Sequence, residues 1–196
     1  LLPQSRYNDI YLVHKFFTWT NELIPNKFKD LTNDHPRMVI PFRDANGKIF
    51  AYQGRAFGKE QPKYITIVLD QNHQKIFGLD RVDDSRNIII VEGPIDSLFL
   101  PNCIAVAQGD LRLPQYKGKS TLVFDNEPRN REIIKNIEKA IKEDYSVVIW
   151  PEDIKEKDIN DMIVGGMTNL EILNIIHRNT FSNLKAKTQL SHWKKI

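Results

Sequence analysis

Acidic side chains follow three of the hydrophobic stretches in this sequence, close to where each stretch ends. They are Glu92 and Asp96, Asp125 and Glu127, and Asp158 and Asp161. Several carboxylates gathered in one place cannot all stay ionised without a compensating cation. Oxygen ligands beside a phosphate substrate favour Mg²⁺, and Mn²⁺ is chemically suitable as well. A metal site therefore explains these acids best, provided that the fold brings them together.

Residues 88–91 predict how the first of these acids is positioned. Four β-branched residues in succession predict a strand that is buried on both faces, as in the centre of a parallel sheet. Gly93 permits a tight turn, and Pro94 suits the first position of a helix, so we expect Glu92 at the carboxyl end of the strand. Ligands bind at that edge of open α/β sheets. The alternative is a glutamate in a solvated turn.

Three further apolar stretches, residues 103–106, 121–124 and 147–150, alternate with connecting segments. Between the last two, residues 128–144 have isoleucines on one side and lysines and glutamates on the other, which predicts an amphipathic helix. This alternation predicts a mostly parallel α/β sheet. Capping is the alternative role for some acids, because Asp96 would lie in the first turn of a helix. Asp158 and Asp161 likewise have the spacing of the N-cap and N3 positions.

The first third of the sequence has a different character. Aromatic and leucine side chains between residues 11 and 23 predict one helix, which Pro25 ends. The pair Asn46-Gly47 separates two β-type runs and predicts a hairpin in a small antiparallel sheet. Basic residues outnumber acids across residues 37–63, with aromatic residues among them, as a surface that tracks a nucleic-acid backbone requires. An ordinary solvated face explains the same charges equally well.

Composition excludes several classes of protein. The chain has 196 residues, 41% of them hydrophobic and 27% charged, enough for one α/β domain and a smaller second one. Its single cysteine, Cys103, can form neither an internal disulfide nor a structural zinc site. No apolar run approaches the roughly 18 residues of a membrane span, and no charged-then-apolar leader is present. We therefore expect a cytoplasmic protein that does not contact a membrane.

The acidic motifs, taken in order, resemble the Toprim fold that primases, topoisomerases and some nucleases share. They are Glu92-Gly93-Pro94-Ile95-Asp96, Asp125-Asn126-Glu127 and Lys157-Asp158-Ile159-Asn160-Asp161. Upstream motifs, among them Pro41-Phe42-Arg43-Asp44 and Phe77-Gly78-Leu79, resemble the basic subdomain that precedes Toprim in bacterial-type primases. With the ending Trp193-Lys194-Lys195-Ile196, the sequence is similar to primases of T-even-type bacteriophages. Most Toprim enzymes have Asp-x-Asp as the second motif, so Glu127 lengthens one ligand, and we expect activity to survive this difference.

The resemblance implies a Toprim-type, mostly parallel sheet flanked by helices and preceded by a small basic α+β subdomain. The expected divisions are an amino-terminal basic subdomain at residues 1–84, the Toprim domain at 85–168, and a helical, basic tail at 169–196. Such primases also carry a zinc-binding domain, and this sequence has no Cys/His cluster. We therefore expect an RNA polymerase domain alone, with no zinc in this chain.

The resemblance further implies Mg²⁺-dependent or Mn²⁺-dependent synthesis of short RNA primers for phage DNA replication. Glu92, Asp125 and Glu127 would be the catalytic metal ligands, and Asp96, Asp158 and Asp161 would support them. Nucleic acid and nucleotides are expected to bind six basic residues: Arg43, Arg55, Lys63, Lys117, Lys119 and Arg129. Of these, Lys117, Lys119 and Arg129 are expected to flank the acidic edge.

The implied partners are a single-stranded DNA template, ribonucleoside triphosphates, the RNA primer and the replicative helicase of a primosome, in the host-cell cytoplasm. Two alternatives remain open. One is a fragment of a Toprim nuclease or topoisomerase, which uses the same acids to break phosphodiesters. The other is a catalytically inactive Toprim module that only holds nucleic acid.

Overall fold

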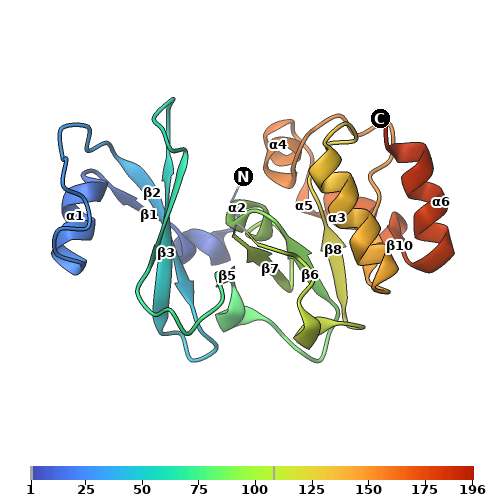
Figure 1. Ribbon diagram of the computed structural model, residues 1–196, viewed down its shortest axis with the longest axis horizontal. Coiled ribbons are helices and arrows are strands. Elements are labelled where there is room, and N and C mark those ends of the chain that lie inside the picture. The colour runs from blue at the N-terminus through green and yellow to red at the C-terminus, as the bar shows by residue number, and fades with distance from the viewer. Residues whose placement is uncertain (1, 108) are drawn as a thin grey trace. The chain divides into compact units, whose positions relative to one another are not determined.

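The computed structural model describes residues 2–107 and 109–196, and the chain divides into two compact units (Figure 1). The amino-terminal unit comprises residues 4–74, and the carboxyl-terminal unit comprises residues 75–196 together with residues 2–3. Each unit contains one sheet, of four strands in the first and six in the second. The expected α/β class is confirmed at this level.

The sheet of the amino-terminal unit is antiparallel throughout, with the strand order β1-β2-β3-β4. Its elements are the 3-10 helix η1 (Gln4–Asp9), β1 (Tyr11–Val13), α1 (Phe16–Leu23), β2 (Arg37–Arg43), β3 (Ile49–Ala56) and β4 (Tyr64–Val68). The predicted hairpin joins β2 to β3, and Gly47 takes a left-handed φ of 80° in its turn. The Asp44 carboxylate accepts the backbone N–H groups of Asn46 and Lys48, at 2.9 and 3.0 Å, which stabilises the turn.

The helix of the amino-terminal unit is shorter than the sequence predicts. Tyr11 lies in the edge strand β1, and α1 begins only at Phe16, so the prediction of one helix from residue 11 is wrong in its first part. The carboxylate of Asp34 accepts the N–H groups of Phe17 and Thr18, at 2.6 and 2.9 Å. A distant residue therefore caps the helix, which local sequence pattern could not reveal.

A small hydrophobic core joins α1 to this sheet. Phe16, Val39, Tyr52 and Ile67 are buried in it. The ring of Phe16 occupies the space that a Cβ at Gly54 would need. Glycine in the middle of β3 thus allows the helix to approach the sheet closely.

The sheet of the carboxyl-terminal unit is mixed, with the order β10-β9-β8-β6-β7-β5. Its strands are β5 (Ile76–Phe77), β6 (Ile88–Val91), β7 (Cys103–Val106), β8 (Ser120–Val123), β9 (Ser146–Val148) and β10 (Thr180–Phe181). The four inner strands pair in parallel, whereas β5 and β10 are antiparallel edges. All four strands predicted from the apolar stretches are present. Because they are parallel, their carboxyl ends lie along one edge.

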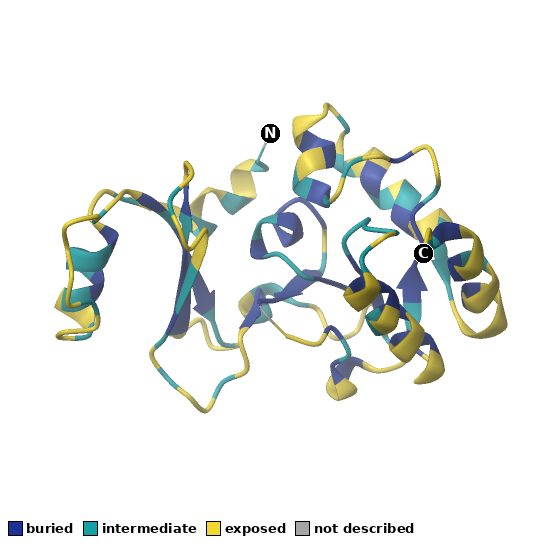
Figure 2. Cartoon of the chain, turned by 45° about the horizontal axis from the view of Figure 1, so that its top comes forward, coloured by how far each residue is buried: buried dark blue, intermediate teal, exposed yellow. Residues whose placement is uncertain are grey.

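Two groups of helices pack on this sheet. The helices are α2 (Pro94–Ser97), α3 (Arg131–Lys142), α4 (Ile159–Val164), α5 (Asn169–Arg178) and α6 (Asn183–Trp193), with the 3-10 helices η2 (Leu79–Arg81) and η3 (Pro114–Tyr116). Helix α3 contacts α6 and β9, whereas α2 contacts β6, β7 and α4, and α4 contacts α5. Figure 2 shows the buried residues concentrated in the strands and along one side of α3, as its amphipathic pattern predicts.

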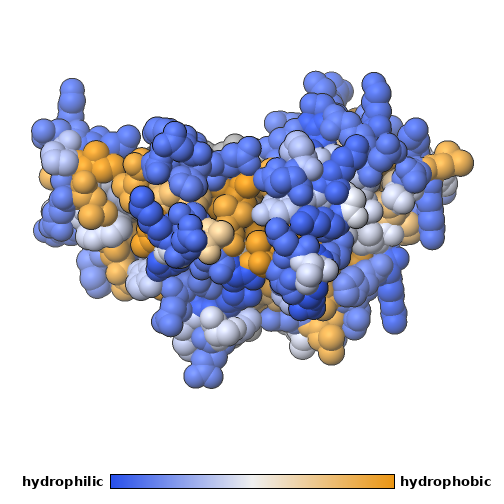
Figure 3. Space-filling model, turned by 90° about the horizontal axis from the view of Figure 1, so that it is seen from below, coloured by the Kyte–Doolittle hydropathy of each residue, from blue (hydrophilic) through white to orange (hydrophobic). Residues whose placement is uncertain are grey.

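No helix in the described part of the chain is long and apolar enough to cross a membrane. Hydrophilic side chains make up most of the face drawn in Figure 3, and the hydrophobic ones form separate groups among them. Exposed aromatic residues include Phe57 and Tyr64, whose exposed fractions are 60% and 37%.

Candidate active site

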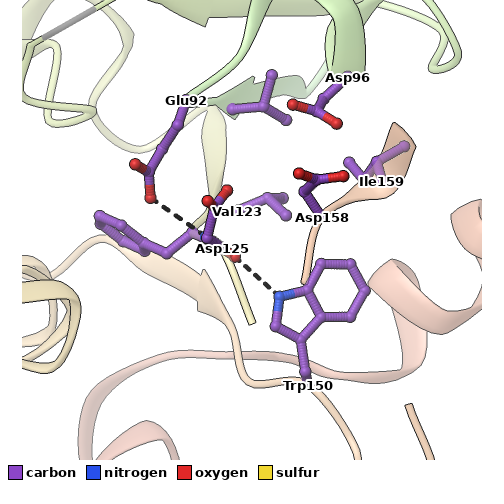
Figure 4. Close-up of a pocket in the computed structure, with 9 residues that line it drawn as sticks. Glu92, Asp96, Val123, Asp125, Trp150, Asp158 and Ile159 are labelled. Carbon is purple, nitrogen blue, oxygen red and sulfur yellow. Dashed lines mark hydrogen bonds between the residues drawn. The ribbon is translucent and has the colours of Figure 1, made fainter. Parts of the chain in front are cut away.

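The ends of two neighbouring strands bring Glu92 and Asp125 together. Strands β6 and β8 pair in parallel, with Val91 opposite Val123, so the residues that follow each strand leave the sheet side by side. One oxygen of the Glu92 carboxylate accepts the backbone N–H of Asp125 at 3.1 Å (Figure 4). The predicted position of Glu92 at the carboxyl end of its strand is thereby confirmed.

Asp96 links this strand edge to a third segment. It lies in the first turn of α2 with only 9% of its surface exposed, and its carboxylate accepts the backbone N–H of Asn160 at 2.8 Å. A Cβ at Gly93 would collide with this carboxylate. Gly93 therefore permits the close approach of Asp96. The bond to Asn160 attaches the start of α4 to the end of β6.

Asp158 and Asp161 take the capping positions that their spacing predicts. Asp158 is the N-cap of α4, and its side chain accepts the backbone N–H of Asp161 at 2.8 Å. The Asp161 residue is exposed. The capping role is thus confirmed for Asp158, whose carboxylate also borders the pocket described next.

An open pocket lies at this edge of the sheet. It is lined by Val91, Glu92, Asp96, Val123, Phe124, Asp125, Trp150, Asp158 and Ile159. Four of these nine residues are acids, and they come from three segments of the chain. Figure 4 shows the carboxylates of Asp96 and Asp158 facing one another, with that of Glu92 beside Asp125. Glu127 and Asp161 are not among the lining residues. The structure therefore brings together four of the six predicted acids around one cavity.

Burial and mutual repulsion make these carboxyl groups unusually weak acids. Burial raises the pKa of Glu92 to about 7, with a further increase from the charge of Asp125. Burial, and then the charge of Asp158, raises the pKa of Asp96 to about 7. Burial also raises the pKa of Asp125 to about 6, against the opposing effect of the Lys157 ammonium. The pocket thus holds negative charge that the protein compensates only in part.

Lys157 is a cation that contacts the second acidic motif. Its Nζ lies 3.5 Å from an oxygen of Asp125 and 3.6 Å from an oxygen of Glu127. Glu127 therefore joins the site indirectly, through the same ammonium group that contacts Asp125. Half of the Lys157 side chain is exposed to solvent, so it is free to move away when another cation approaches.

The oxygen atoms of this site are of the kind that binds a hard divalent cation, although the side chains are not yet close enough together to hold one. Its carboxylate oxygens are the ligands that Mg²⁺ and Mn²⁺ prefer, and a positive charge among them would offset the burial and mutual repulsion that raise their pKa values. Among the residues that the structure describes, no three His, Cys, Asp or Glu side chains already form a metal-binding group. Side-chain rotations, including that of Lys157, would have to complete such a site.

The basic residues predicted in the amino-terminal unit fall into two places. Arg55 donates from Nε to the Tyr64 hydroxyl at 3.2 Å, and Lys63 Nζ lies 5.6 Å from the centre of the Tyr64 ring. Arg43 is near the hairpin turn, where it pairs with Ile49 and donates to the carbonyl of Gly47. Ile49 and Arg55 are six positions apart along β3, so the backbone of Arg43 lies about 20 Å from that of Arg55.

Lys117 and Lys119 do not flank the acidic edge as expected. Both precede β8, whereas Asp125 follows it, so they are at opposite ends of the strand. Lys119 pairs with Asp84 at 3.7 Å, and Lys117 lies over the Tyr145 ring. Arg129, by contrast, is exposed just beyond Glu127. Nucleic-acid binding by these residues stays a prediction.

Sequence reasoning missed four residues that shape the site. Lys157 adjoins a predicted acid, which was the available signal for it. Asn126 separates two predicted acids, yet its side chain bonds the segment at 154–156. Trp150 and Trp193 donate indole N–H groups to the loop around Asp125, at Phe124 and Asn126. No local pattern indicates either indole contact.

Solved structures of primase catalytic domains share this fold. The zinc-binding and RNA polymerase domains of the Aquifex aeolicus primase match 98% of this chain and 58% of that chain, with a TM-score of 0.65 and 18% identity. A DnaG catalytic core matches 98% of this chain and 78% of that one, with a TM-score of 0.62 and 14% identity. The chain therefore has the fold of DnaG-type primase cores.

Sequence similarity leads to the same proteins. The DNA primase of Enterobacteria phage T4 is 37% identical over all of this chain and 58% of its own length. The DNA primase of Thermotoga maritima is 28% identical over 62% of this chain and 25% of its own length. No protein-family model matches the chain. The chain thus resembles DNA primases along its whole length, and it spans little more than half of the phage relative.

Proposed function

We propose that this chain is the RNA polymerase domain of a DNA primase, which joins ribonucleotides on single-stranded DNA to make short primers for phage DNA replication. The observation that carries the proposal is the 37% identity with the phage T4 DNA primase over the full chain. The acidic pocket at the carboxyl edge of the parallel sheet supports it, because that edge is where α/β sheets bind ligands. The sheet and its acids are assigned to a Toprim-type domain.

In the proposed reaction, a 3′ hydroxyl attacks the α-phosphate of a ribonucleoside triphosphate, and pyrophosphate leaves. Glu92, Asp125 and Glu127 would hold Mg²⁺ or Mn²⁺, with Asp96, Asp158 and Asp161 as further ligands or supports. When bound, the ion would activate the attacking hydroxyl and screen the negative charge of the departing pyrophosphate. The protein positions these acids through the bonds from Asp125 to Glu92 and from Asn160 to Asp96.

Positive side chains complete the proposed site. Lys157 lies beside Asp125 and Glu127 and offsets their charge, and when turned away from these two acids its ammonium would be available to the phosphates of the nucleotide. Arg129, exposed beside the acidic loop, is suited to the same role. Phosphoryl chemistry depends mainly on this kind of positioning and charge neutralisation.

The amino-terminal unit is proposed to guide the template. Arg55 and Lys63 present positive charge beside the Tyr64 ring, and such a combination binds a phosphate backbone and stacks with bases. One structure with this fold is a DnaG primase catalytic domain bound to single-stranded DNA, with a TM-score of 0.56 and 18% identity. We assign residues 1–84 to the basic subdomain, 85–168 to the Toprim domain and 169–196 to the tail. The replicative helicase is the proposed protein partner.

Extension of a primed single-stranded template with radiolabelled ribonucleotides tests the proposal. The expected result is template-dependent RNA synthesis that requires Mg²⁺ or Mn²⁺ and is lost in Glu92→Gln. Cleavage of the DNA in place of synthesis would indicate the nuclease alternative. Binding of DNA with neither reaction, at any concentration of either ion, would indicate the inactive module.

A further inference from the structure

Asn126, the middle residue of the second acidic motif, uses its whole side chain to hold neighbouring segments. Its Nδ2 donates to the carbonyl oxygens of Ile154 and Glu156, each at 3.1 Å. Its Oδ1 accepts the indole N–H of Trp193 at 3.1 Å. Both donors and the acceptor of the amide are therefore occupied by protein groups, and Asn126 does not line the pocket.

The bonds of Asn126 join two of the three segments that carry the acids. Its backbone N–H also donates to the carbonyl of Lys157, at 2.6 Å. The loop that carries Asp125 and Glu127 is thus fastened to the segment that carries Lys157 and Asp158. Asp158 caps α4, and Asp96 accepts the N–H of Asn160 in the first turn of α4, so the segment that Asn126 holds is linked to the other acids of the pocket.

The carboxyl-terminal helix supplies the remaining contact. Ala186, Leu190 and Trp193 form the buried face of α6, and the Lys195 backbone N–H donates to the carbonyl of Pro128 at 2.8 Å. On the other side of Asp125, Trp150 donates its indole N–H to the carbonyl of Phe124 at 2.8 Å (Figure 4). The residues immediately before and after Asp125 are therefore each held by a buried indole.

We infer that Asn126 and Trp193 are positioning residues of the acidic site, and that α6 is a working part of that site. This inference rests on the proposed function. The amide fits the position because it offers two donors to two carbonyl oxygens and an acceptor to an indole. An aspartate there would set a carboxylate against both carbonyls, so the second motif cannot gain another acid at this point without breaking the connection.

Removal of the indole N–H, with an aromatic ring kept at position 193, tests the inference. Trp193→Phe loses the donor to Asn126 together with part of the buried indole ring, and Asn126→Ala loses all of the side-chain bonds. The matched control is Lys194→Ala, which removes the neighbouring ion pair of α6 with Glu138, 3.0 Å long, at the surface. Circular dichroism selects a temperature at which every variant is fully folded.

Three readouts separate positioning from a general loss of stability. Mn²⁺ binding is followed by electron paramagnetic resonance, kcat and KM for the ribonucleotide by primer extension, and hydrogen exchange in residues 152–158 by mass spectrometry. Residues that hold metal ligands in place typically affect affinity or activity by about 10-fold to 100-fold. We expect Trp193→Phe to lower Mn²⁺ affinity and kcat by about 10-fold with KM unchanged, and to accelerate exchange in residues 152–158. Lys194→Ala should match the wild type.

A double-mutant comparison assigns the effect to the contact itself. In the Asn126→Ala background, Trp193→Phe should cause no further loss, because the bond is already absent. The inference would be overturned if Trp193→Phe kept the wild-type Mn²⁺ affinity and kcat, or if Lys194→Ala lost as much as Trp193→Phe. Additive losses in the double variant would overturn it as well. If the wild type makes no RNA, the proposed function fails. Mn²⁺ binding and hydrogen exchange then decide the inference, and unchanged exchange in Trp193→Phe overturns it.

Discussion

The carboxylate of Glu92 accepts the backbone N–H of Asp125 at 3.1 Å, so the ends of two adjacent parallel strands are joined by a charged group. A glutamine can make the same bond through its side-chain oxygen. It cannot supply the negative charge that a divalent cation needs. Position and charge can therefore be separated experimentally at residue 92.

Glu92→Gln is expected to abolish RNA synthesis and to stabilise the metal-free protein. At pH 8 the substitution removes a buried charge that repels Asp125, so the free energy of unfolding should rise by about 1 to 3 kcal/mol. Urea denaturation in the presence of EDTA measures this change. Glu152→Gln, at an exposed acid of a nearby loop, is the control and should alter neither property. Retention of wild-type synthesis in Glu92→Gln would remove Glu92 from the catalytic site.

The contribution of Glu92 and Asp96 to the stability of the metal-free protein should fall as the pH rises from about 4 to about 7. The pKa of Glu92 is about 7 in the folded protein against an ordinary value of 4.5, and that of Asp96 is about 7 against 3.8. Between about pH 4 and pH 7 these two carboxyl groups therefore bind protons more tightly in the folded protein than in the unfolded protein. Their contribution to stability is fully present at about pH 4 and is lost as the pH rises through 7. Urea denaturation at pH 5 and pH 8 measures the difference. If the difference in free energy of unfolding between the wild type and Glu92→Gln were the same at pH 5 and pH 8, this prediction would be contradicted.

Lys157→Met should increase the affinity of the protein for Mn²⁺. The ammonium lies 3.5 Å from Asp125 and 3.6 Å from Glu127, where it competes with a metal ion for the same oxygens. Because the side chain is half exposed, we expect a gain of roughly fivefold, or about 1 kcal/mol. Calorimetric titration with Mn²⁺ measures it. Lys155→Met, two residues away, is the control, and weaker binding in Lys157→Met would show that the ammonium does not compete.

Local pattern was enough to predict much of the carboxyl-terminal unit. The β-branched run of β6 favours a buried strand, and the isoleucine stripe of α3 favours an amphipathic helix. The sequence pattern predicts helix at the three-residue edge strand β1, because so short a segment gains its structure from pairing with β2 and not from local pattern. Parallel pairing likewise made the meeting of Glu92 and Asp125 predictable. The contact of Trp193 with Asn126 joins residues 67 positions apart, and no period in the sequence encodes it.

Arg55→Ala and Lys63→Ala are each expected to weaken binding of single-stranded DNA. Loss of one phosphate contact should lower the slope of log K against log salt concentration by about one unit. Fluorescence anisotropy at several salt concentrations measures both quantities. Lys29→Ala, at an exposed residue of the same unit, is the control. Unchanged affinity and slope in both variants would place the template on a different surface.

Gly93→Ala should destabilise the protein through Asp96 alone. The backbone of Gly93 has φ of −97° and ψ of 130°, which alanine adopts without strain, so the turn itself tolerates the change. The new Cβ would collide with the Asp96 carboxylate, whose bond to the N–H of Asn160 fixes the start of α4. We expect a loss of about 1 to 3 kcal/mol in the free energy of unfolding, as for other overpacked sites.

The double variant supplies the control for this prediction. In an Asp96→Ala background the colliding carboxylate is gone, so Gly93→Ala should cost little there. Urea denaturation of the wild type, both single variants and the double variant gives the coupling between the two positions. A loss of equal size in both backgrounds would mean that the collision is with another group, or that the turn requires glycine for its own conformation. A loss confined to the wild-type background would establish that Gly93 is present so that Asp96 can reach α4.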